Sequence, residues 1–172
     1  FGTITAGKGF MAKNSYYPEG VESSLNGATD VRQTNISNVS GKSVMTIGNI
    51  TSLVGSPNYN EFWNGQIAEV LVFNSLLSMA QETILENYLS ARYNLPLAAA
   101  KNIYLMDDSL QGNYDNDVTG IGMATDTSAV LESGGLDMLS ISNPSSLQLD
   151  EWLFIGHNGK PSQDSMQTLV PT

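Results

Sequence analysis

Turn-forming residues recur through the first third of this chain and constrain its fold more than any other feature. The stretches "YYPEG", "SLNGATD", "VSGK" and "GSPN" follow one another at intervals of about ten to fifteen residues. Between two of them, residues 44–50 ("VMTIGNI") alternate apolar and polar side chains, as a half-buried strand does. This spacing predicts an antiparallel β-sandwich or jelly roll rather than β–α–β units.

A single helix is expected in the middle of the chain. Ser78 and Gln81 have the spacing of a capping box, and Asn94 and Pro96 supply the signals that end a helix. Apolar residues between these ends recur at helical period and form a stripe, with polar residues off the stripe: Ile84, Leu85, Tyr88 and Leu89 against Glu82, Glu86, Asn87 and Ser90. We expect a short amphipathic helix that lays its apolar stripe on a sheet.

The run that precedes the helix, residues 66–73, has the composition of a strand. Its sequence "QIAEVLVF" places mostly apolar side chains on both faces of an extended backbone. Strands that are apolar on both faces lie in the interior of a sheet and are covered on each side. The sequence therefore predicts a central strand here.

Further short strands are expected in the second half, separated by loops rich in Asp, Ser and Gly. They cover residues 103–106, 118–121, 136–141 and 152–155, and no helix is expected among them. The stretch "LPLAAAKN" before them is typical of a linker. We therefore expect two units, a sandwich over residues 1–96 and a second small β-rich domain over residues 97–172.

Residues 59–95 carry a specific pattern. An aromatic residue is followed by "NGQIAEVLVFN", then "LLS", then a helix that ends in "YLSARYNL". The pattern is carried by Phe62, Gly65, Ile67, Glu69, Val70, Val72, Phe73, Leu77 and Ser78. This stretch resembles the C-terminal part of concanavalin A-like, laminin G-type jelly-roll domains. The resemblance implies a two-sheet sandwich with the helix covering one edge, and an N-terminal half that is missing or shortened.

A second resemblance covers the stretch from "VTGIGMATD" to "LDEWLFIGHNG". It is similar to a β-rich module that follows such jelly rolls in Bacteroidota-type surface proteins. Residues 123–126 ("MATD") depart from that pattern, which has a basic–acidic run at this position. Together the resemblances imply a piece of a long secreted protein, truncated in its second module and flanked by other modules of the same polypeptide.

Charge limits the partners that such a chain can have. Its 172 residues include 17 acidic and 7 basic ones, for a net charge of -10. Nucleic acids and anionic membrane surfaces would be repelled, because binding them needs clustered Lys and Arg. Glycans, surface proteins and divalent cations remain compatible partners. The chain has no cysteine, and its longest apolar run is too short to span a bilayer.

The residues do not predict catalysis. Glycoside hydrolases, some of which share the sandwich fold, use two carboxylates at close spacing, but Glu69 is the only acid in its predicted strand. We expect Glu69 to form an ion pair or a hydrogen bond within the sandwich. His157 is the only histidine and is expected in a turn, because a zinc site or a Ser–His–Asp triad needs further partners. A hydrolase with its active-site strands upstream of Phe1 is a weaker alternative.

Two ligand sites are candidates. Asn60, Trp63 and Asn64 could stack on and hydrogen-bond a sugar ring, although an aromatic plug at the sandwich edge explains Trp63 as well. A calcium ion could be bound by Asp115, Asp117 and Asp126, which imitate part of a calcium loop, although solvated turn acids explain these residues as well. No cofactor is required in either case.

These features favour a non-catalytic segment of a large extracellular, cell-surface protein. It would act in adhesion or as a structural stalk module, with a glycan or a surface protein as partner. The alternative is a carbohydrate-binding module of a glycan-degrading enzyme.

Overall fold

The computed structural model describes residues 4–34, 47, 49–51, 60–62, 64–135 and 140–159. Within them, ten strands and one 3-10 turn accompany a single α-helix. All pairs of strands are antiparallel, and no sheet closes on itself. The described part of the protein is therefore β-rich with one helix, as expected from the turn spacing.

The first sheet is a meander of three neighbouring strands. Its members are β1 (Ala12–Tyr17), β2 (Gly20–Leu25) and β3 (Ala28–Thr34), in that order. Asn26 and Gly27 connect β2 to β3, and both have a positive φ, of 51° and 77°. Asn and Gly tolerate this left-handed backbone, which two-residue hairpin turns require. The turn predicted at "SLNGATD" is thus the hairpin turn between β2 and β3.

The second half forms another antiparallel sheet. Its strands are β6 (Asn116–Thr125), β7 (Ser128–Val130) and β10 (Trp152–His157), in the order β10-β6-β7. The predicted strands 118–121 and 152–155 are confirmed as parts of β6 and β10. Beside β6, the strands β8 (Glu132–Gly134) and β9 (Ser140–Ser142) form a small hairpin. Of the predicted strand 136–141, residues 136–139 lie outside the described residues.

Two short strands and one short turn complete the fold. β4 (Asn49–Thr51) pairs with β5 (Asn60–Phe62), so the described end of the predicted strand 44–50 takes part in a ladder. Residues 44–46 and 48 lie outside the described residues. A 3-10 turn at Ser109–Gln111 corrects the expectation that the second half contains no helix. Asp108 caps this turn by accepting a hydrogen bond from the backbone N–H of Leu110 at 2.7 Å.

The helix α1 (Met79–Tyr93) begins and ends where the sequence predicts. Ser78 Oγ accepts from the backbone N–H of Gln81 at 3.3 Å, and Gln81 Oε1 accepts from the backbone N–H of Ser78 at 2.9 Å. Asn94 adopts the left-handed conformation that closes the last turn, with φ 49°. Both capping predictions are confirmed.

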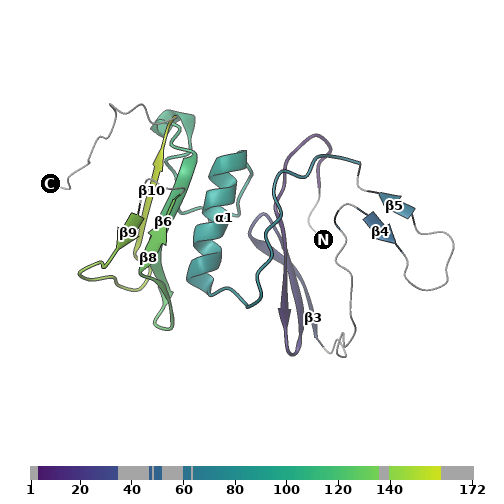
Figure 1. Ribbon diagram of the computed structural model, residues 1–172, viewed down its shortest axis with the longest axis horizontal. Coiled ribbons are helices and arrows are strands. Elements are labelled where there is room, and N and C mark those ends of the chain that lie inside the picture. Colours follow the sequence, from purple (N-terminus) through teal and green to yellow (C-terminus); the bar gives the residue numbers. More distant parts are fainter. Residues whose placement is uncertain are drawn as a thin grey trace.

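The prediction of which helix face is buried was wrong. The buried residues of α1 are Ala80, Thr83, Glu86, Asn87, Ser90 and Ala91, whereas the predicted apolar stripe is only half-buried. The physical reason is that α1 lies between the β1–β3 sheet and the β10-β6-β7 sheet (Figure 1). Its polar face is covered because hydrogen bonds and ion pairs replace water there. For example, Lys13 of β1 contacts the carboxylates of Glu82 and Glu86 at 2.9 and 3.2 Å.

Asn87 fixes the expected linker onto the helix. Its Nδ2 donates to the backbone carbonyl of Lys101 at 2.9 Å, and its Oδ1 accepts from the backbone N–H groups of Ile103 and Tyr104, both at 2.9 Å. Residues 103–106 are therefore not the strand predicted for them, because a helix side chain takes up two of the N–H groups that a ladder would need. Leu105 and Met106 in this run are exposed.

The predicted central strand 66–73 was also wrong. The structure places no strand there, and residues 66–73 are almost all exposed to solvent. Strand composition predicts a β-ladder only when a partner strand lies alongside. Among the described residues, no such strand lies beside this run.

The apolar core is small for a chain of this length. Among the described residues, the buried apolar side chains are Met11, Ala80, Ala91, Tyr104, Val118 and Ile121.

Candidate interaction site

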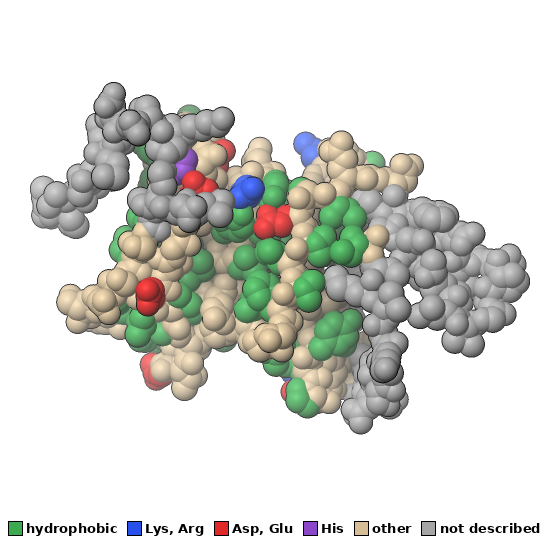
Figure 2. Space-filling model, in the orientation of Figure 1, with side chains coloured by type: hydrophobic (Ala, Val, Ile, Leu, Met, Phe, Trp, Pro, Cys, Tyr) green, Lys and Arg blue, Asp and Glu red, His purple; other side chains and the backbone are tan. Residues whose placement is uncertain are grey.

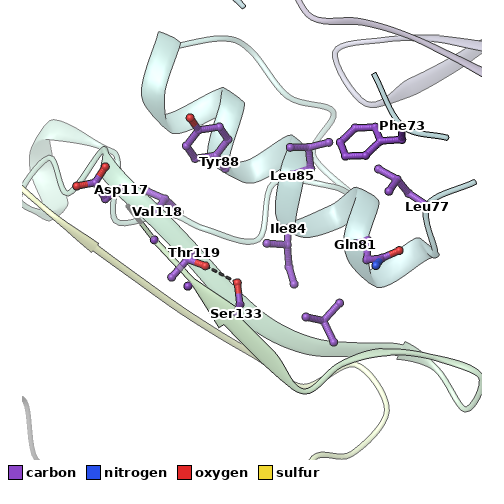
Figure 3. A pocket seen from close by; sticks show the side chains of 13 residues that line it. Phe73, Leu77, Gln81, Ile84, Leu85, Tyr88, Asp117, Val118, Thr119 and Ser133 are labelled. Carbon is purple, nitrogen blue, oxygen red and sulfur yellow. Dashed lines mark hydrogen bonds between the residues drawn. The ribbon is translucent and has the colours of Figure 1, made fainter. Parts of the chain in front are cut away.

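The 66–73 segment follows α1 along its length. In the middle of the segment, Tyr93 Oη donates a hydrogen bond to Glu69 Oε2 at 2.8 Å, beside the last turn of the helix. This bond raises the pKa of Tyr93, because the carboxylate stabilises the protonated phenol. At its C-terminal end, Phe73 lies close to Leu85 of α1 (Figure 3). The segment is therefore held in its middle, through Glu69, and at its C-terminal end, through Phe73. Glu69 forms a hydrogen bond, as the sequence predicts.

Apolar side chains of this segment and its extension reach the solvent. Their exposed fractions lie between 42% and 69%, for Ile67, Val70, Leu71, Val72, Phe73 and Leu76. Hydrophobic side chains are visible at the surface across the middle of the molecule in Figure 2. A single exposed apolar residue is ordinary, whereas a contiguous run marks an interaction surface. We call these six residues the apolar run.

The backbone of the 66–73 segment is also available. Its N–H and C=O groups make no backbone hydrogen bond to another residue in the described ranges. An extended chain with free N–H and C=O groups is a template for pairing with another strand. The segment therefore offers both apolar side chains and hydrogen-bonding groups.

A cleft of about 600 Å³ continues this surface between α1 and the second sheet. Ile84 points from α1 toward β6 across it, whereas Leu85 points toward Phe73 (Figure 3). Its apolar walls are completed by residues from the segment, α1 and the sheet, namely Phe73, Leu77, Tyr88, Val118 and Val130. The apolar stripe predicted for α1 thus faces an open cleft, which explains why it is only half-buried.

Polar side chains close one end of the cleft. Asp117 Oδ2 lies 2.8 Å from His157 Nε2, and the backbone N–H of Gly159 donates to His157 Nδ1 at 3.4 Å. This arrangement fits a histidine that carries its proton on Nε2 and donates a hydrogen bond from it to Asp117. The hydroxyls of Thr119 and Ser133 hydrogen-bond each other beside this pair. These contacts tie β6 to β10 and β8, which is a structural role.

His157 differs from its prediction in position and partner. It is the last residue of β10 rather than a turn residue. Its pairing with Asp117 was not predicted from the sequence, because the two residues are 40 positions apart and no local pattern links them.

The predicted glycan patch can be placed only in part. Asn60 belongs to β5, but its side chain and the whole of Trp63 lie outside the described residues. Asn64 is exposed. The predicted sugar contact at Trp63 therefore remains a prediction.

The three predicted calcium ligands are not brought to one place. Asp115 precedes β6 and accepts hydrogen bonds from the side-chain amides of Asn113 and Asn116. Asp117 lies at the start of β6 and Asp126 follows its end, which puts them about 30 Å apart along an extended strand. In the described ranges, no three Asp, Glu or His side chains form a group that could hold a metal ion.

Burial raises the pKa of two side chains, Asp107 and Tyr104, in the stretch that leads into β6. Loss of solvent raises the pKa of Asp107, and the nearby charges of Asp108 and Asp115 raise it further. Burial likewise raises the pKa of Tyr104, whose hydroxyl donates to the backbone carbonyl of Tyr114 at 2.6 Å. Neither residue lines the cleft.

No protein-family model, curated protein or solved structure matches this chain. None of the described helices is long and apolar enough to cross a membrane. The function is therefore argued from the geometry of the apolar run and the cleft beside it.

Proposed function

We propose that this chain is a non-catalytic module of a larger secreted cell-surface protein, acting in adhesion or as part of a stalk. In this role it binds neighbouring polypeptide through the apolar run. The observation that carries the proposal is the exposure of 42–69% for side chains whose sequence is that of a buried strand. Burying such a run against a partner would stabilise the complex by about 25 cal/mol for each Å² removed from water.

The proposal extends to the architecture and the location. The resemblance of residues 59–95 to laminin G-type domains supports a jelly roll. The antiparallel pairing of the described sheets is compatible with that architecture. The same resemblance supports a location outside the cell.

Accessibility of the apolar run is tested with the dye ANS, which fluoresces on exposed apolar surface. The native chain is expected to bind the dye, and Val72→Lys is expected to lower the signal by about a fifth, in proportion to the apolar area lost from the run. Val72 suits this test because it is 69% exposed and lines no part of the cleft. Equal signals from the two proteins, with identical circular dichroism, would argue against the proposal.

A glycan array separates this proposal from a carbohydrate-binding module. The array is probed with and without calcium, using the native chain and Trp63→Ala. We expect no glycan signal that depends on Trp63. A glycan signal that is lost in Trp63→Ala would instead support the carbohydrate-binding alternative.

A further inference from the structure

We infer that the 66–73 segment is completed by an added β-strand, an extended polypeptide with alternating apolar residues and basic ends. The inference rests on the proposed function and names the chemistry of the partner. The added strand would pair its backbone with the segment and lay its apolar side chains beside the apolar run.

The backbone supports this mode of binding. The segment contains five Ile, Val, Leu or Phe residues in "QIAEVLVF" and neither Pro nor Gly, so every one of its residues can donate to a ladder. Extended, it spans about 26 Å, the length of an ordinary strand. In strand addition, main-chain hydrogen bonds supply affinity and alternate side chains supply specificity.

The segment is also positioned before the partner arrives. Glu69 is bound to Tyr93, and Phe73 contacts the wall of the cleft. A segment fixed at these two points loses less conformational entropy when it pairs than a free chain does. The entropy lost on pairing would thus be smaller here than at an unattached loop.

The negative charge of the chain favours an added strand with basic residues. The chain has a net charge of -10, so a second copy would bring an equal negative charge to the interface. Repulsion between two such bodies disfavours self-association, whereas lysines at the ends of an added strand are attracted.

The test uses a short fluorescent peptide that alternates valine and threonine between terminal lysines. Binding to the full chain is followed by anisotropy, and amide exchange in the 66–73 segment is followed by NMR. We expect saturable binding, slower exchange at alternate residues of the segment, and about tenfold weaker binding of a peptide with terminal glutamates. Absence of binding, or binding without protection of these amides, would overturn the inference.

Two variants at one position provide the matched control. Val72→Pro removes a backbone donor from the segment, whereas Val72→Thr keeps it and retains strand propensity. We expect at least about tenfold weaker peptide binding for Val72→Pro and little change for Val72→Thr, with α1 intact in both variants by circular dichroism. Equal binding by the two variants would contradict backbone pairing.

Light scattering without peptide tests the other occupant. If the measured mass doubles and the 66–73 amides become protected without peptide, the segment pairs with a second copy of the chain. That result would overturn the inference of a basic strand. A Trp63-dependent glycan signal, by contrast, would overturn the proposed function and leave strand addition standing.

Discussion

Tyr93 Oη donates a hydrogen bond to Glu69 Oε2 at 2.8 Å, and this contact joins the last turn of α1 to the 66–73 segment. It links a helix that is capped at both ends to a segment with no ladder of its own. The bond therefore decides how far the segment moves from the helix.

Tyr93→Phe should release the segment. Without the phenol hydroxyl, Glu69 loses its partner, and the peptide bond after Glu69 becomes more accessible to a protease that cleaves after glutamate. We expect cleavage at Glu69 several-fold faster than in the native chain, measured by mass spectrometry. Tyr16→Phe is the control, because Tyr16 is 68% exposed and distant in sequence. Equal cleavage rates in the two variants would show that the bond does not hold the segment.

Asn87→Ala should destabilise the protein strongly. Asn87 is 1% exposed, and its removal leaves the backbone groups of Lys101, Ile103 and Tyr104 without the partner that satisfies them. We expect a loss of about 3 kcal/mol in the free energy of unfolding, measured in urea. Asn102→Ala, at an exposed neighbouring position, should change the stability little. A loss in Asn87→Ala no larger than in this control would contradict the role given to Asn87.

Asp107→Asn should stabilise the protein at neutral pH. Because burial raises the pKa of Asp107 in the folded state, the folded protein binds this proton more tightly than the unfolded chain does. The stability that this group contributes is thus present at low pH and is lost as the pH rises through the folded pKa. We expect a higher urea midpoint for the variant at pH 7.

The gain should disappear below about pH 3.9, where Asp107 is protonated in both states. Asp126→Asn serves as control, since Asp126 is exposed in the turn between β6 and β7. A gain of the same size at both pH values would attribute the effect to something other than the charge of Asp107.

The elements that sequence reasoning predicted correctly are those fixed by neighbouring residues. The ends of α1 depend on Ser78, Gln81 and Asn94, which act within one or two turns. The hairpin between β2 and β3 depends on the turn residues Asn26 and Gly27. Local hydrogen bonds and φ preferences are written in the sequence itself, so such features can be predicted.

The elements that were predicted wrongly depend on contacts between distant segments. The buried face of α1 is polar because Asn87 meets residues 101–104 and Lys13 meets Glu86, and periodicity carries no information on such partners. The 66–73 segment has strand composition, but a ladder also needs a neighbour. The candidate site itself was missed for the same reason, since its residues were expected in the core.

Hydrogen exchange of the backbone amides at 66–73, measured by NMR on the free chain, reports directly whether this backbone is unpaired. We expect rapid exchange, close to that of an unstructured peptide, while amides in the middle of α1 are protected by at least about a hundredfold. Protection of the 66–73 amides equal to that in α1 would contradict this expectation, because the backbone would then already be paired.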